Sequence, residues 1–257
     1  MINITLEANV KGLGEVYKVE NAPFDEALKA LGDKEIITAR DLAYARIKEG
    51  KDSSLSQNGS YIREGVVYVP NSQNKIILIR NSLILKSPKK AVQAHRKGEE
   101  YLISKKLANN VSKYADDAIT LSNVNSIPTN RFGEDQTTAW LFNDMAKEYG
   151  LFLKDECDIN EMLLSFDSNE YINKQKSPYA NQLWLHWLDN WSGLDGYGRF
   201  LYNGDRAHGV RLEHETQKIS ESSLDSKVQA ALNSGLAFEY KGKIYAPINT
   251  KNLSLNK

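Results

Sequence analysis

The chain of 257 residues contains a single cysteine, Cys157. One cysteine excludes an intramolecular disulfide framework, so the stability of the protein must come from packing. We expect Cys157 to be a small buried apolar residue rather than a nucleophile. The N-terminal sequence MINITLEANV has neither a basic start nor a long apolar run, and runs such as Ile76–Ile79 are far too short to span a membrane. These absences predict a soluble protein without membrane insertion, cytoplasmic as synthesised, and they leave display at a surface open.

Net charge is absent as well, because 33 Lys and Arg residues balance 33 Asp and Glu residues. A neutral chain has no overall attraction to nucleic acid or to anionic membranes. The segment 80–106 is locally basic, with eight Lys and Arg residues against Glu99 and Glu100. A nucleic-acid-binding protein that uses this segment is therefore one alternative. The helical spacing of these charges and the lack of interleaved aromatic residues favour a solvated helix surface, so we expect no nucleic-acid partner.

Signatures of catalysis and of metal binding are also missing. His208 and His214 lie near Asp205 and other carboxylates, but the four histidines of the chain match no zinc-binding spacing. The Asp- and Gly-rich run 189–196 fails the spacing of an EF-hand loop, which leaves only a looser calcium site open there. Phosphate-binding loops and G-x-S-x-G elbows do not occur in the sequence. We expect no catalytic residue, metal or cofactor, and a hydrolase that uses Asp and His residues of 186–214 is the enzymatic alternative.

Hydrophobic alternation and capping signals predict a mixed α+β chain. Strands are expected at 2–7, 15–19, 61–69, 75–85, 183–185 and 210–213, with a hairpin at 236–248. Helices are expected at 23–31, 38–49, 88–95, 99–114, 137–149, 158–166 and 223–233. Thr38 is the expected N-cap of the second helix, Asp158 and Glu161 form a capping-box pattern, and Gly150 is expected to end the helix 137–149. We interpret 61–69 and 75–85 as an antiparallel pair.

The most informative stretch is 178–212, which holds three of the four tryptophans, five of the sixteen glycines and no lysine. Rigid aromatic residues among small polar residues and arginines are typical of a recognition surface. Tryptophan is more often a core residue, and we expect a core position for Trp184, because residues 183–185 form an apolar strand pattern. The Asp and Asn residues between 189 and 205 interrupt the aromatic residues too often for a sealed interior. We therefore expect a loop-rich, exposed surface there.

The stretch 178–212 resembles the variable region of target proteins of diversity-generating retroelements, as described from archaea and their viruses. Gly209-Val210-Arg211 matches the glycine, hydrophobe and arginine with which that region typically ends, and 55–70 and 127–140 resemble its companion segments. The resemblance implies an α+β fold whose C-type-lectin-like core has antiparallel strands and several helices. It also implies an N-terminal α+β part, 1–120, and a C-type-lectin-like part, 121–257, or else one continuous domain. The implied function is non-enzymatic binding of an unknown ligand, expected to be a protein, through a diversified surface patch.

The same resemblance divides the stretch into fixed and diversified positions. Structural roles are implied for Trp184, Gly193, Gly198, Arg199, Gly209 and Arg211, and fixed positions also for Leu183, Leu188, Ser192, Leu194 and Leu201. The diversified, ligand-binding positions are implied to be His186, Trp187, Asp189, Asn190, Trp191, Asp195, Tyr197, Phe200, Tyr202, Asn203, Asp205 and His208. We therefore expect the side chains of 186–208 to be largely exposed, above buried Trp184, Leu188, Leu194 and Leu201.

Overall fold

The computed structural model describes residues 2–73, 75–111, 118–121, 125–188, 192–197, 201–212, 238–240 and 243–245. The chain divides into two compact units, Met1–Glu213 and His214–Lys257. In the second unit, β13 (Phe238–Tyr240) and β14 (Lys243–Tyr245) pair in antiparallel fashion, which confirms the expected hairpin at 236–248. The helix expected at 223–233 lies outside the described residues.

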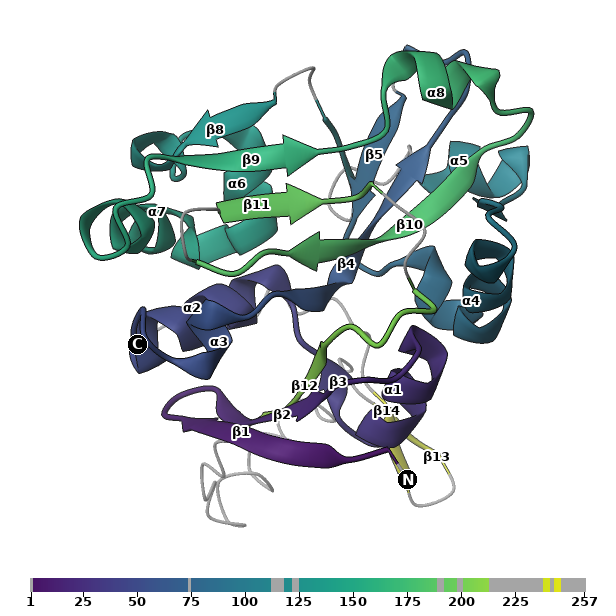
Figure 1. Ribbon diagram of the computed structural model, residues 1–257. Coiled ribbons are helices and arrows are strands. Elements are labelled where there is room, and N and C mark those ends of the chain that lie inside the picture. The colour runs from purple at the N-terminus through teal and green to yellow at the C-terminus, as the bar shows by residue number, and fades with distance from the viewer. Residues whose placement is uncertain are drawn as a thin grey trace. The chain divides into compact units, whose positions relative to one another are not determined.

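The first unit is built on one mixed sheet (Figure 1). Its main path follows, in spatial order, β1 (Ile4–Val10), β2 (Gly14–Val19), β12 (Ala207–Leu212), β4 (Ser60–Tyr68), β10 (Tyr179–Leu185), β11 (Ser192–Asp195), β9 (Glu161–Ser165) and β8 (Ser126–Pro128). Shorter strands join this path: β3 (Glu35–Ile36) at β12, β5 (Ile76–Ile79) at β4, β7 (Ala118–Thr120) at β5, and β6 (Tyr101–Leu102) at β10. Most pairs are antiparallel, and β12–β4 and β11–β9 are parallel.

Strands from both sides of residue 120 are neighbours in this sheet, for example β4 and β10. The expected boundary between 1–120 and 121–257 therefore does not divide the fold. The described structure instead places the boundary after Glu213. The expected antiparallel pair 61–69 and 75–85 is confirmed by β4 and β5, although β5 ends at Ile79.

Helices pack beside the strands (Figure 1). They are α1 (Phe24–Leu31), α2 (Ala39–Glu49), α3 (Ser54–Gln57), α4 (Pro88–Arg96), α5 (Lys105–Val111), α6 (Gln136–Phe142), α7 (Ala146–Asp155) and α8 (Asn169–Lys174), with 3-10 turns η1 (Leu83–Lys86), η2 (Thr129–Arg131) and η3 (Asn143–Met145). The main core joins α2, α6 and α7 to the central strands through buried residues such as Leu42, Leu141, Leu153 and Leu185. The N-cap of α2 is as expected, because the Thr38 hydroxyl oxygen accepts a hydrogen bond from the Asp41 amide at 3.0 Å.

Three expected helices were wrong in whole or in part. The segment 158–166 contains strand β9 instead, because Asp158 has φ of 56°, outside the range of an N-cap, and β9 pairs with both β8 and β11. The expected helix 137–149 is interrupted at Asn143, where φ is 54°. Gly150 does not end it but lies inside α7, where a Cβ would clash with the main-chain oxygen of Thr129. The segment 99–114 holds the short strand β6 before α5.

Candidate ligand-binding cleft

Six of the twelve expected ligand-binding residues line one cleft of about 350 Å³. These six are His186, Trp187, Asp195, Tyr197, Asn203 and Asp205. The remaining walls come from Tyr61, Gln182, Trp184 and Leu201. The cleft therefore gathers residues from β4, β10 and β11 and from the segments that follow β10 and precede β12.

An irregularity between β4 and β10 shapes the floor of the cleft. Gln182 lies opposite Gly65 and Trp184 opposite Tyr61, so three residues of β4 face the single residue Leu183. The Gln182 amide nitrogen fills this bulge by donating hydrogen bonds to the main-chain oxygens of Ile62 and Glu64. Extra residues in one strand re-aim the side chains beside them. Here the bulge brings the rings of Tyr61 and Trp184 into edge-to-face contact, with centroids 4.9 Å apart.

A row of aromatic rings runs from the core to the surface along this floor. Phe24 contacts Tyr61 with ring centroids 4.9 Å apart, and beyond Trp184 the row continues to His186 at 6.5 Å and from there to Trp187 at 5.3 Å. Phe24 is 1% exposed, whereas Trp187 is 37% exposed. Trp184 was expected to be buried, but it is half-buried because one side of its ring forms a cleft wall. Its other side packs on Gly59, where a Cβ would come within 2.5 Å of the indole.

Polar groups in the cleft offer both donors and acceptors. His186 Nε2 lies 3.7 Å from Asp195 Oδ2, and Asp195 Oδ1 accepts a hydrogen bond from the Tyr197 amide at 2.6 Å. The Tyr61 hydroxyl donates to Asp205 at 3.3 Å. Burial, together with the Asp205 carboxylate, raises the pKa of Tyr61 well above its usual value, and burial raises the pKa of Asp205. The Tyr61 hydroxyl therefore stays protonated and can act as a donor at neutral pH.

The framework, meaning the described residues outside 178–212, forms hydrogen bonds to main-chain atoms of the segment 186–208. The bonds to main-chain oxygens of the segment come from Arg46 to His186 (2.7 Å), Tyr68 to Gly196 (2.8 Å), Phe24 to Leu201 (2.8 Å), Asn21 to Gly204 (3.0 Å), Tyr61 to Arg206 (3.2 Å) and Ile37 to His208 (3.0 Å). The Leu188 amide donates to the Ser56 oxygen at 2.7 Å. Main-chain bonds of this kind form whatever side chain occupies the anchored position.

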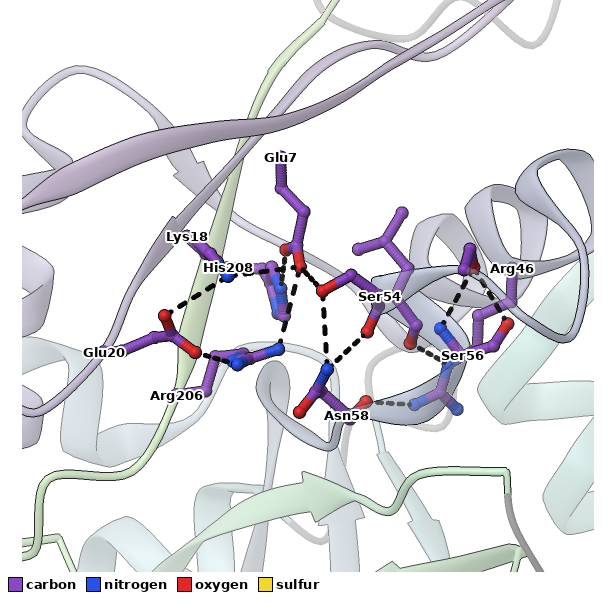
Figure 2. A network of polar contacts seen from close by, with 11 residues as sticks. Glu7, Lys18, Glu20, Arg46, Ser54, Ser56, Asn58, Arg206 and His208 are labelled. Atoms are coloured by element: carbon purple, nitrogen blue, oxygen red, sulfur yellow. Dashed lines mark hydrogen bonds and ion pairs between the residues drawn. The ribbon is translucent and has the colours of Figure 1, made fainter.

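His208 differs from the other expected ligand-binding residues that the structure describes, because it is buried away from the cleft. Its side chain is 0% exposed and pairs with Glu7, which also contacts Ser54, Lys18 and Arg206 (Figure 2). Burial lowers the pKa of His208, so the buried imidazole is neutral at pH 7 and donates to the carboxylate. Burial alone would raise the pKa of Glu7, but the hydrogen bond from His208, the charge that His208 carries once it is protonated, the hydrogen bond from Ser54 and the charge of Lys18 lower it to about 2. The expectation that the His208 side chain is exposed is therefore wrong, and a side chain buried in this way is not placed to contact a ligand.

The other expected positions fall into four groups. Tyr202 is 39% exposed but does not line the cleft. Leu188, Leu194 and Leu201 are buried as expected, and the structural glycines Gly193 and Gly209 are buried against His186 and Leu31. Arg211 is exposed, over the ring of Tyr17 and 3.4 Å from Glu15. Outside the described residues lie the ligand-binding positions Asp189, Asn190, Trp191 and Phe200 and the structural positions Gly198 and Arg199.

Sequence reasoning missed Tyr61, Gln182 and Arg46 as contributors to this region. Tyr61 belongs to the segment 55–70 that resembles a companion of the variable region, which is the signal that could have identified it. Gln182 and Arg46 carry no such signal, because their roles depend on the β4 bulge and on burial of the end of α2. Cys157 was expected to be buried but is half-buried, and burial together with Glu156 raises the pKa of its thiol.

Other kinds of site find little support in the described part of the chain. The described residues include no cluster of three His, Cys, Asp or Glu side chains suited to a metal ion. Over the same residues, helices fall short of the length and apolar character that crossing a membrane requires. In the basic segment 80–106, the Arg80 guanidinium stacks over Trp140 at 4.2 Å from the ring centre. Neither the hydrolase nor the nucleic-acid alternative is tested by these observations, and both stay predictions.

Comparison with known proteins identifies the fold. No protein-family model matches the sequence, and neither does any curated protein. The structure is similar to a solved protein from Nanoarchaeota described as "Accommodation of massive sequence variation in Nanoarchaeota by the C-type lectin fold", with a TM-score of 0.59 over 79% of this chain and 100% of that chain. This chain has a C-type lectin fold. The two sequences are 17% identical, so the likeness concerns the fold. The expected α+β, C-type-lectin-like fold is confirmed, although its sheet is mixed rather than antiparallel.

Proposed function

We propose that the protein is a non-enzymatic binding protein that presents a diversified, aromatic-rich cleft on a C-type lectin scaffold. The observation that carries this proposal is that main chain and side chains have different roles in 186–208. The framework bonds to main-chain atoms of this segment, whereas six of its expected ligand-binding side chains line one cleft. Because these framework bonds are made to main-chain atoms of 186–208, the six cleft residues can change without loss of those bonds. The similar protein from Nanoarchaeota, described as accommodating massive sequence variation, supports the same reading.

The proposed ligand is a protein. The cleft of about 350 Å³ lies at the small end of the range of small-molecule pockets, so it leaves little room for a large cofactor and can accept one or two side chains of a protein surface. Trp187 and Tyr197, which are 37% and 58% exposed, offer large rigid contact areas at a low entropic cost. His186, Asp195 and Asn203 add donors and acceptors at the same opening. This combination is typical of surfaces that recognise proteins.

A selection experiment tests the proposal. A displayed library randomised at the six expected positions in the cleft, His186, Trp187, Asp195, Tyr197, Asn203 and Asp205, is selected for binding to lysozyme as the target protein. A matched library randomises six exposed framework positions: Lys89, Lys90, Gln93, Lys97, Lys105 and Lys106. We expect folded binders from the cleft library and none from the matched library. Failure to recover binders from the cleft library, or equal recovery from both, would contradict the proposal.

The genetic part of the proposal has its own test. If 178–212 is diversified by a retroelement, an imperfect repeat of its coding sequence should lie nearby and differ from it at adenines. Genomic sequencing that finds no such repeat would remove the diversification mechanism while leaving the binding function to the selection experiment.

A further inference from the structure

Arg46, near the end of α2, is among the largest fully buried side chains in the described part of the chain. Its guanidinium donates four hydrogen bonds: from Nε to the Leu55 oxygen at 2.9 Å, from Nη1 to the Tyr149 hydroxyl at 2.9 Å, and from Nη2 to the Asn58 oxygen at 3.0 Å and the His186 oxygen at 2.7 Å. All four acceptors are neutral. Across the described residues, no carboxylate forms an ion pair with Arg46.

A buried arginine without a countercharge needs an explanation beyond packing. A buried charge is strongly unfavourable unless hydrogen bonds satisfy it, and apolar residues of similar volume often serve stability equally well. The four bonds of Arg46 instead connect three separate parts of the chain: the α3 region at Leu55 and Asn58, helix α7 at Tyr149, and residue 186 of the cleft. Figure 2 shows the guanidinium beside Ser56 and Asn58. The planar fork of an arginine suits such a junction because its donors point in fixed directions.

We propose that Arg46 is a positioning residue of the cleft, which sets where the side chains of 186 and 187 project. The inference rests on the proposed function, because it concerns the same cleft. Arg46 holds the His186 oxygen, and two residues later Ser56 holds the Leu188 amide, so Trp187 is flanked by two fixed main-chain points. Both contacts are made to main-chain atoms of the segment. Arg46 therefore positions whatever side chains occupy 186 and 187. Replacing those side chains, as a change of ligand specificity would require, leaves the hydrogen bond from Arg46 intact.

The test compares two variants that remove bonds from opposite ends of the same guanidinium. Arg46→Met removes the contact with His186, whereas Tyr149→Phe removes a buried bond of Arg46 that does not touch the cleft. Hydrogen exchange of the Leu188 amide reports on the cleft. The Val66 amide reports on global stability, because β4 is paired on both sides there.

We expect Leu188 exchange, relative to Val66, to be at least tenfold faster in Arg46→Met and to change less than threefold in Tyr149→Phe. Equal relative rates in the two variants would overturn the proposal, because they would show a purely structural role. If Arg46→Met does not fold, Arg46→Lys takes its place. A lysine has one side-chain nitrogen, which cannot bond to the Tyr149 hydroxyl, the Asn58 oxygen and the His186 oxygen together. The exchange rate of Leu188 relative to that of Val66 should therefore rise at least threefold in this variant. An unchanged rate in that variant would also overturn the proposal.

A binding measurement separates this inference from the proposed function. In a lysozyme binder from the cleft library, we expect Arg46→Met to weaken affinity at least tenfold and Tyr149→Phe to weaken it less than threefold. Equal losses would overturn the positioning role while leaving the binding function in place. Absence of any binder from the library would instead contradict the proposed function, and hydrogen exchange would still decide the role of Arg46.

Discussion

Replacing Glu7 by glutamine removes one negative charge from the buried network around His208 (Figure 2). The pKa of Glu7 is lowered from 4.5 to about 2 in the folded protein. A difference of this size corresponds to roughly 3 kcal/mol of folding free energy when the carboxyl is ionised in both states. Part of this shift comes from the charge of protonated His208, which is absent at pH 7. We therefore expect Glu7→Gln to lower the free energy of unfolding by at most roughly 3 kcal/mol at pH 7.

The direction of the pKa shift of Glu7 determines how the effect of Glu7→Gln depends on pH. Because the folded pKa of Glu7 is depressed, its stabilisation is fully present above pH 4.5 and is lost as the pH falls toward 2. Glu7 raises the pKa of His208 against the effect of burial, so the pKa of His208 is lower still in Glu7→Gln, and this variant loses more stability than wild type below pH 6.5. The gap in stability between wild type and Glu7→Gln should therefore widen as the pH falls from 6.5 to about 5, and the contribution of Glu7 itself should be lost below 4.5.

Urea unfolding followed by circular dichroism at pH 7, 5.5, 4.5 and 3.5 measures this gap. Glu20→Gln is the matched control, because Glu20 pairs with Arg206 and Lys18 in the same network but is one-third exposed. A pair that is exposed to this extent contributes about 1 kcal/mol or less. A loss in Glu7→Gln no larger than that in Glu20→Gln, or a loss that is the same at all four pH values, would refute this prediction.

Two further predictions concern packing around the cleft. Trp187→Ser should change the free energy of unfolding by about 0.5 kcal/mol or less because Trp187 is exposed, whereas Leu201→Ala should lower it by about 2–5 kcal/mol because Leu201 is buried. Denaturant melts that show equal losses for the two variants would place Trp187 in the core. Gly59→Ala should cost about 1–3 kcal/mol, because its Cβ would lie 2.5 Å from the Trp184 indole. Thermal melts should show a smaller loss for Gly133→Ala, where the new Cβ would meet only the exposed residue Lys147, at 3.0 Å from its side chain; the reverse order would contradict the described packing.

Local signals in the sequence were sufficient where the structure obeys local rules. The alternation of apolar residues in 61–69 and 75–85 predicted the β4–β5 pair, although β5 ends at Ile79, and Thr38 with Asp41 predicted the start of α2. The aromatic and glycine content of 178–212 predicted a recognition surface there, and most of the residues that line the cleft belong to this stretch, although its role in recognition stays a prediction. These features need no knowledge of distant contacts, because strand alternation and helix caps are encoded over a few residues.

Tertiary contacts decided the features that the sequence did not reveal. Asp158 and Glu161 form a capping-box pattern, yet pairing with β8 and β11 makes 161–165 a strand. His208 was grouped with exposed neighbours, and its burial depends on Glu7, 201 residues away in the chain. Arg46 resembles an ordinary solvated residue near the end of a helix, and its role depends on acceptors up to 140 positions away. Such long-range partners leave no periodic trace in a single sequence.

A saturation scan of stability across residues 184–208 tests the central claim most directly. Each position is substituted in a displayed library, and resistance to pulse proteolysis reports the folded fraction. The account predicts that the six expected cleft positions accept most substitutions, and that Leu188, Gly193, Leu194, Leu201 and His208 accept few. The account is contradicted if the six cleft positions prove as intolerant as the three buried leucines, because a cleft whose side chains hold the fold together cannot be freely diversified.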